Sequence, residues 1–229
     1  MKRTLPFVII IGVFGCALLG VWYLKRSAGE TPNVVRPGTY RPTSKASSIK
    51  LGADPPHTLG TTDAPAMLEE FGDFECLPCG SAYPVLKNLK KEFGSDVVIV
   101  FRQFPLVAKH AHAMDAAKAA EAAGLQGKFW PMHDLLYENQ KTWRTAADPQ
   151  SLFAEYAAQT GLEPNSFRRD AAGDRVNQRI ALDRERGYWV GVNSTPTVFL
   201  NGREVPPDSV TTEKLRDLVR SELAANRRN

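Results

Sequence analysis

The stretch GDFECLPCG, Gly72 to Gly80, carries two of the three cysteines of this chain, with two residues between them. A short apolar strand is predicted before the pair, from roughly Met67 to Phe74. After the pair, a helix is predicted that ends at Gly94 and whose apolar face carries Tyr83, Leu86, Leu89 and Phe93. The pattern therefore places Cys76 and Cys79 where a strand ends and a helix begins.

This position favours thiol chemistry. The N-terminus of a helix presents unpaired backbone N–H groups and a partial positive charge, and both stabilise a thiolate. Because only the thiolate attacks a disulfide, a thiol whose pKa is lowered suits disulfide exchange. We expect Cys76 at the exposed helix start as the attacking residue. Cys79, one turn further in, would resolve the mixed disulfide.

Other uses of the pair have weaker support. A zinc site needs two more ligands at suitable spacing, but the only further cysteine is Cys16, and the four histidines offer no ligand-like pair except His110 and His112. A structural disulfide across so small a loop would remove little entropy from the unfolded chain. No metal is therefore expected, and no cofactor beyond a redox-active disulfide of Cys76 and Cys79. A Cu(I)-binding or chaperone module that uses the same cysteines remains an alternative.

The rest of the domain predicts an α/β fold. DVVIVFRQFPL, residues 96–106, reads as a buried strand, so that strand, helix and strand form a βαβ unit with a partly parallel sheet. Helical segments separated by Gly, Pro and Asn fill residues 107–190. TPTVFLNGREV, residues 195–205, then predicts a hairpin with Asn-Gly at its turn, and a last amphipathic helix follows.

The N-terminal part has a different character. Leu5 to Leu24 is an uncharged apolar run, long enough to span a bilayer as a helix, with basic residues on both sides. We predict an uncleaved membrane anchor at residues 1–26. A cleaved signal peptide and a lipoprotein site at Cys16 fit less well. Residues 27–57, rich in Pro, Ser, Thr and Gly, predict a flexible linker, and residues 58–229 form the domain.

The charge does not point to nucleic acid. The formal net charge is +4, but Lys and Arg are interspersed with Asp and Glu along the domain, and basic runs are short. Partners other than nucleic acid are therefore expected.

With these elements in place, the sequence resembles the thioredoxin superfamily, and more closely its DsbA-like branch with an inserted helical subdomain, over about residues 60–222. Glu70 lies six residues before Cys76, where the family often has a buried acid beneath the active-site helix. Strand alternation turns only one of Glu69 and Glu70 inward, and the offset selects Glu70. The resemblance implies that Glu70 relays a proton to or from Cys79 through water.

Three further segments carry the resemblance. Pro84 matches a proline inside the active-site helix of thioredoxins. NSTPTVFLNG resembles the segment with the family's cis-proline, which would be Pro196, and the backbone of Thr195 before it would pair with an extended client segment. FRQFPL and QGKFWPMHDLLYENQ are close to segments of many bacterial DsbA-like proteins.

The resemblance implies a protein thiol-disulfide oxidoreductase that acts on clients with thiols or disulfides outside the cytoplasmic membrane, where disulfides persist. The expected location is the bacterial inner membrane, single-pass, with the domain in the periplasm and a membrane redox partner. DsbA-like oxidases often have a histidine between the cysteines, whereas this chain has Leu77-Pro78. A dithiol oxidase is favoured, and a reductase or isomerase stays open.

Overall fold

The computed structural model describes residues 52–227. Within this range a five-stranded sheet has the order β1-β3-β2-β4-β5. Strand β2 pairs in parallel with β3 and antiparallel with β4, so the sheet is mixed, as predicted. The strands are β1 (His57–Leu59), β2 (Ala66–Gly72), β3 (Val97–Gln103), β4 (Thr197–Leu200) and β5 (Arg203–Glu204).

Strand β2 leads from the middle of the sheet to the cysteine pair. It and β3 are buried almost throughout because their sequences, AMLEEFG and VVIVFRQ, are rich in apolar and β-branched residues. At the end of β2, a Cβ on Gly72 would lie 2.5 Å from the ring of Phe101. Only glycine fits at this point, and the chain leaves the sheet directly after it.

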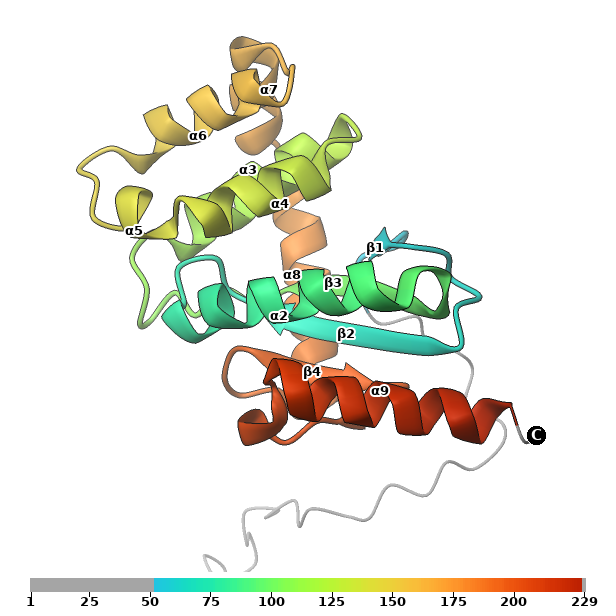
Figure 1. The fold of residues 1–229 in the computed structure, drawn as a ribbon. Coiled ribbons are helices and arrows are strands. Elements are labelled where there is room, and N and C mark those ends of the chain that lie inside the picture. The colour runs from blue at the N-terminus through green and yellow to red at the C-terminus, as the bar shows by residue number, and fades with distance from the viewer. Residues whose placement is uncertain (1–51, 228–229) are drawn as a thin grey trace, which may run out of the picture. The chain divides into compact units, whose positions relative to one another are not determined.

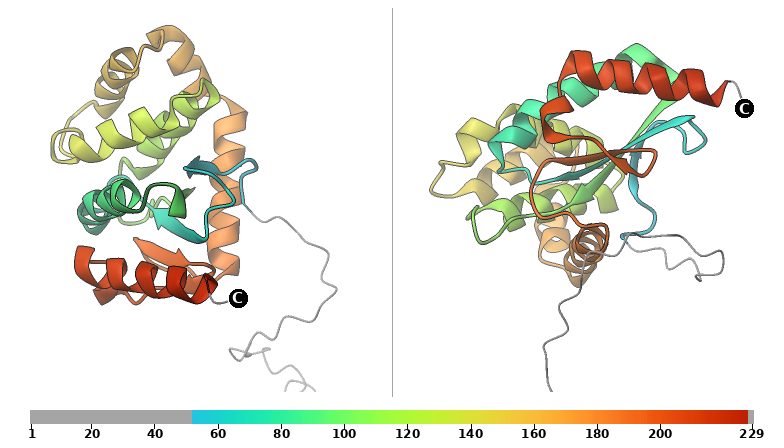
Figure 2. Two further views of the ribbon diagram at one scale, coloured as in Figure 1. Left: turned by 45° about the vertical axis from the view of Figure 1, so that its right-hand side comes forward. Right: turned by 90° about the horizontal axis from the view of Figure 1, so that it is seen from below.

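Helices cover both faces of the sheet. Helices α2 (Leu77–Phe93) and α9 (Thr212–Asn226) lie on one face and α8 (Asp174–Trp189) on the other (Figures 1 and 2). The layer under α2 and α9 is an apolar cluster that includes Leu68, Leu86, Leu89, Ile99, Val198, Leu215 and Val219. On the other face, a Cβ on Gly187 of α8 would lie 2.6 Å from the ring of Phe104, so the helix and the sheet approach closely.

Six helices lie between β3 and β4 in the chain, within the stretch predicted to be helical. They are α3 (Ala113–Leu125), α4 (Phe129–Glu138), α5 (Gln140–Trp143), α6 (Pro149–Gln159), α7 (Pro164–Ala171) and α8. Alanines fill the buried face of α3, which lets its neighbours pack closely. In Figure 1, α3 to α7 gather beyond one edge of the sheet, and α8 runs from this group back along the sheet.

The hairpin of β4 and β5 has the predicted turn. Asn201 and Gly202 both have positive φ, 48° and 77°, as a two-residue Asn-Gly hairpin requires. Strand β1, by contrast, was not predicted, because three residues are too few to display an alternating pattern.

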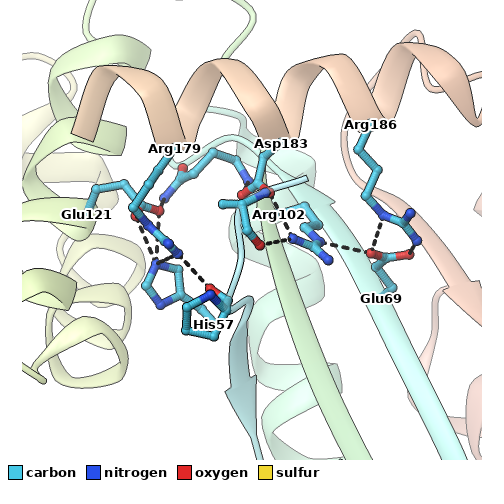
Figure 3. A network of polar contacts seen from close by, with 10 residues as sticks. His57, Glu69, Arg102, Glu121, Arg179, Asp183 and Arg186 are labelled. Carbon is cyan, nitrogen blue, oxygen red and sulfur yellow. Dashed lines mark hydrogen bonds and ion pairs between the residues drawn. The ribbon is translucent and has the colours of Figure 1, made fainter. Parts of the chain in front are cut away.

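A network of buried charges ties α8 to the sheet (Figure 3). Arg186 of α8 donates two hydrogen bonds to the carboxylate of Glu69 on β2, each 2.8 Å long. Arg102 of β3 donates to Glu69 at 2.9 Å and to Asp183 of α8 at 2.9 Å. Burial opposes ionisation of Glu69, but its bonds to Arg186 and Arg102 outweigh this effect and lower its pKa. The network therefore holds a carboxylate ionised inside the fold.

The same network fixes the segment that enters the domain. The backbone N–H of Ala53 donates to Asp183 at 2.8 Å, and Nε2 of His57 lies 2.9 Å from Glu121 of α3. Arg179 of α8 donates to the same Glu121 carboxylate at 2.7 Å. Residues 53–57, which the sequence assigned to the linker, are thus bonded to the domain.

Within residues 52–227, none of the helices is long and apolar enough to cross a membrane. The predicted anchor, Cys16 and the predicted linker up to residue 51 lie outside the described residues.

Candidate functional site

The cysteine pair lies at the junction of β2 and α2, as predicted. Cys76 is the N-cap of α2, and its backbone N–H donates to Asp73 O at 3.1 Å. Pro78 occupies the first turn, where its missing N–H costs no helical hydrogen bond. Cys76 is only 5% exposed and Cys79 is fully buried, so the expectation of an exposed attacking cysteine was wrong.

The pKa values of the two thiols are shifted in opposite directions. The pKa of Cys76 is lowered to about 6, chiefly because Cys79 donates a hydrogen bond to its sulfur, while burial works against this and Thr195 adds to it. Burial raises the pKa of Cys79 well above the ordinary value, and the bond to Cys76 raises it further. At neutral pH Cys76 is therefore a thiolate held by a neutral Cys79 thiol, which is the state that a nucleophile and its resolving partner need.

The predicted cis-proline loop lies against Cys76. The peptide bond between Thr195 and Pro196 is cis, and in the thiol form Cys76 Sγ donates to the Thr195 carbonyl at 3.3 Å. The Thr195 hydroxyl is buried, and hydrogen-bond geometry gives it no partner within the described residues, although it contributes to the lowered pKa of Cys76.

A groove of about 550 Å³ opens beside this contact. Its walls come from the start of α2, the cis-proline loop and the segment before α9: Leu77, Pro78, Ser81, Ala82, Ser194, Thr195, Pro196, Pro207 and Val210. Leu77 is 47% exposed, so an apolar side chain next to Cys76 faces the groove from the helix start.

Glu70 lies beneath α2, on the side of β2 opposite to Glu69. It is 2% exposed, and its Oε1 has no hydrogen-bond partner among residues 52–227. Burial raises the pKa of Glu70 to about 8, with a smaller contribution from the charge of Cys76. Glu70 in turn raises the pKa of Cys79. The expectation that only one of the two glutamates turns inward was wrong, since Glu69 is also buried, at 5% exposure.

Sequence reasoning missed the residues that support the turn before Cys76. The buried carboxylate of Asp73 accepts from the backbone N–H groups of Glu75 and Leu106 and lies 2.8 Å from Nδ1 of His110. Asp73 is three residues from Cys76, but two of these partners, Leu106 and His110, follow β3, more than thirty residues along the chain. No local pattern could have paired them.

Gln140 is a second residue that the sequence did not reveal. Its Nε2 donates to the carbonyl oxygens of Phe74 and Cys76 at 2.7 and 2.8 Å. A Cβ on Gly80 would lie 2.5 Å from Gln140 Oε1, which explains the glycine directly after Cys79. Gln140 of α5 thereby binds the backbone before and at Cys76 and packs against Gly80 after the pair.

The described residues include no group of three or more His, Cys, Asp and Glu side chains placed to hold a metal ion. Both cysteines in this range are free thiols.

A family model described as Thioredoxin matches residues 53–221, and the chain belongs to this family. Among solved structures, BdbD from Bacillus subtilis (oxidised) is 22% identical, with a TM-score of 0.65 over 76% of this chain and 97% of that chain. MdbA, a thiol-disulfide oxidoreductase from Corynebacterium diphtheriae, is 19% identical, with a TM-score of 0.59 over 72% and 88%. Wolbachia pipientis alpha-DsbA1 is 17% identical, with a TM-score of 0.63 over 76% and 94%. The predicted family and DsbA-like fold are confirmed.

Curated relatives are longer proteins. Na(+)/H(+) antiporter NhaA 1 from Salinispora arenicola is 36% identical over 222 residues, which cover 96% of this chain and 33% of that protein. Na(+)/H(+) antiporter NhaA 1 from Mycolicibacterium vanbaalenii is 38% identical over 151 residues, 65% of this chain and 24% of that protein. The chain thus spans about a quarter to a third of the length of these relatives.

Proposed function

We propose that this protein is a thiol-disulfide oxidoreductase that exchanges disulfides with client proteins through Cys76 and Cys79. The observation that carries the proposal is the pairing of a thiolate-forming cysteine at a helix start with a fully buried thiol that donates to it, beside a cis-proline loop. This arrangement supplies one sulfur that attacks or leaves easily and one that stays protected until a mixed disulfide forms.

The favoured direction is dithiol oxidation. A client thiolate attacks Cys76 Sγ of the Cys76–Cys79 disulfide, and the Cys79 sulfur leaves with the electron pair and takes a proton. A second client thiolate then attacks the client sulfur of the mixed disulfide, and Cys76 leaves as a thiolate. The low pKa of Cys76, about 6, makes it a good leaving group and stabilises the reduced enzyme, which is the property of an oxidant.

The groove beside Cys76 is proposed as the client site. An extended client segment can pair with the backbone of Thr195, while an apolar client side chain packs on Leu77 and Val210. Backbone pairing recognises any sequence, which suits an enzyme with many clients.

The proposed location is extracytoplasmic, on the periplasmic side of a bacterial inner membrane, with residues 1–26 as a single-pass anchor and a membrane redox partner that reoxidises the pair. The fold, shared with MdbA, supports exchange with proteins. The similarity to proteins named as Na(+)/H(+) antiporters supports a place at a membrane.

The test is the reduction potential of the Cys76–Cys79 couple in the purified full-length chain, equilibrated with glutathione buffers. A Cys16→Ser background leaves one couple to titrate. A reduction potential of about −120 mV supports the oxidase, and one of about −270 mV indicates a reductase. Cys76→Ser should abolish the oxidation of a reduced, unfolded client. Wild-type protein that oxidises and reduces no client but binds Cu(I) would contradict the proposal.

A further inference from the structure

Asp73 shapes the turn that brings Cys76 to the start of α2. The carbonyl oxygen of Asp73 accepts from the backbone N–H of Cys76 at 3.1 Å, and its Oδ1 accepts from the backbone N–H of Glu75 at 2.8 Å. An aspartate that bonds to the backbone two residues further on makes an Asx turn. The side chain of Asp73 is fully buried. A carboxylate therefore lies inside the fold, within the turn that ends at Cys76.

The charge of this carboxylate works against the Cys76 thiolate. The pKa of Cys76 is lowered chiefly by the hydrogen bond from Cys79, and the charge of Asp73 opposes this lowering. Two negative charges repel each other more strongly in the interior of a protein than in water. A hydrogen-bond donor on the carboxylate stabilises its negative charge and weakens the repulsion. The thiolate thus depends on the donors that hold Asp73.

The second oxygen of Asp73 meets the loop that follows β3. Oδ2 accepts from the backbone N–H of Leu106 at 2.8 Å and lies 2.8 Å from Nδ1 of His110. The backbone N–H of His110 donates to the carbonyl oxygen of Leu106 at 3.0 Å, so a single turn of the chain directs both groups to the same oxygen. Because a carboxylate oxygen only accepts, the Nδ1–H of the imidazole is the donor.

We propose that His110 is a positioning residue for disulfide exchange: by donating to Asp73 it holds the carboxylate in the turn and reduces the effect of its charge on Cys76, so that Cys76 stays reactive as a thiolate. The inference rests on the proposed function and adds a residue that sets the oxidising strength of the cysteine pair. It also assigns a role to a histidine outside the dipeptide Leu77-Pro78, which itself provides no positive charge.

Other bonds hold the loop in place when the imidazole is removed. Glu75 Oε2 accepts from the backbone N–H of His112 at 2.6 Å, and Asp73 Oδ2 keeps its bond from the backbone of Leu106. Both bonds use backbone N–H groups, which a change of side chain at position 110 leaves intact. The protein should therefore fold without the imidazole, and the effect on the thiol can be measured separately.

The experiment compares variants of two histidines in the same loop, in the full-length chain with Cys16→Ser. His110→Leu removes the donor, and His110→Asn keeps one because the amide N–H group of asparagine lies close to the place of Nδ1. His112→Leu is the matched control, since it keeps the backbone bond to Glu75. The rate at which iodoacetamide alkylates Cys76 is measured across a range of pH, and equilibration with glutathione buffers gives the reduction potential.

His110→Leu should raise the pKa of Cys76 by at least about half a unit, because the charge of Asp73 then acts more strongly on the thiolate. At pH 7 the equilibrium constant for oxidation of glutathione should fall at least about twofold, which makes the reduction potential about 10 mV more negative. His110→Asn should restore both values, and His112→Leu should leave them unchanged. A histidine that only braced the loop would lower the urea midpoint and move neither value.

A second background tests whether His110 acts through Asp73. Asp73→Asn removes the charge, so His110→Leu in this background should no longer change the pKa of Cys76. Should Asp73→Asn fail to fold, the rescue by His110→Asn decides.

The role of His110 is overturned when His110→Leu leaves the pKa of Cys76 unchanged or lowers it, when His110→Asn behaves like His110→Leu, or when the effect persists with Asp73→Asn. Each of these results leaves the oxidoreductase function intact. A wild-type protein that forms no mixed disulfide with glutathione would instead overturn the proposed function.

Discussion

The raised pKa of Glu70 predicts how the free energy of unfolding changes with pH. Its pKa is raised from 4.5 to about 8 in the reduced fold, so above pH 4.5 the unfolded chain ionises Glu70 while the folded protein keeps it protonated. Folding stability is therefore lost as the pH rises, and the loss is complete near pH 8. At about 1.4 kcal/mol per pKa unit, the penalty is about 3 kcal/mol at pH 7 and about 5 kcal/mol above pH 8.

Glu70→Gln removes this penalty because the amide has nearly the same shape and stays neutral. The variant should match wild type below pH 4.5 and become more stable as the pH rises, by about 3 kcal/mol at pH 7. Urea unfolding of the reduced proteins at a series of pH values measures the difference. A difference that does not change with pH would refute the raised pKa, and with it the role of Glu70 as a proton donor at neutral pH.

Three further predictions concern the surroundings of the cysteines. Thr195→Val removes the hydroxyl but keeps the carbonyl contact, so it should raise the pKa of Cys76, measured by thiolate absorbance across a pH titration. Glu69→Gln leaves the half-buried guanidinium of Arg186 without its carboxylate and leaves Arg102 with Asp183 alone, so it should lower the free energy of unfolding in urea by about 3 kcal/mol. The matched control Glu92→Gln breaks exposed contacts to Arg216 and Arg220 and should cost much less. Gly80→Ala should displace Gln140 and lower the melting temperature, and a smaller side chain in Gly80→Ala/Gln140→Ser should restore part of it.

The sequence predicted the features whose causes are local. The helix face after the cysteines, the glycine at its end and the Asn-Gly turn each depend on residues within one element or its boundary. The resemblance added Glu70 and Pro196, which lie beside the cysteines only after folding. It did so by offset and motif. In the structure Glu70 is near enough to raise the pKa of Cys79, and Thr195, directly before the cis-proline Pro196, contacts Cys76.

The features that the sequence did not predict depend on contacts between segments that are far apart in the chain. Gln140 meets the Cys76 carbonyl 64 positions away, and a glutamine in an amphipathic segment carries no sign of such a partner. Glu69 was expected to face solvent by strand alternation, but α8 covers that face of the sheet and supplies Arg186 to neutralise it. Strand alternation predicts to which face of the sheet a side chain points. The packing of helices decides whether that face is excluded from solvent.

The difference between local causes and contacts between distant segments also bears on the direction of electron flow. A dipeptide of Leu77 and Pro78 provides no positive charge, and for that reason the sequence left the oxidising strength open. In the fold, however, the acidity of Cys76 comes first from the Cys79 thiol and then from Thr195, neither of which depends on the dipeptide. With a pKa lowered to about 6, Cys76 is mainly ionised at pH 7. Because a stabilised thiolate favours the reduced enzyme, the cis-proline loop and the buried cysteine support a dithiol oxidase even without a histidine between the cysteines.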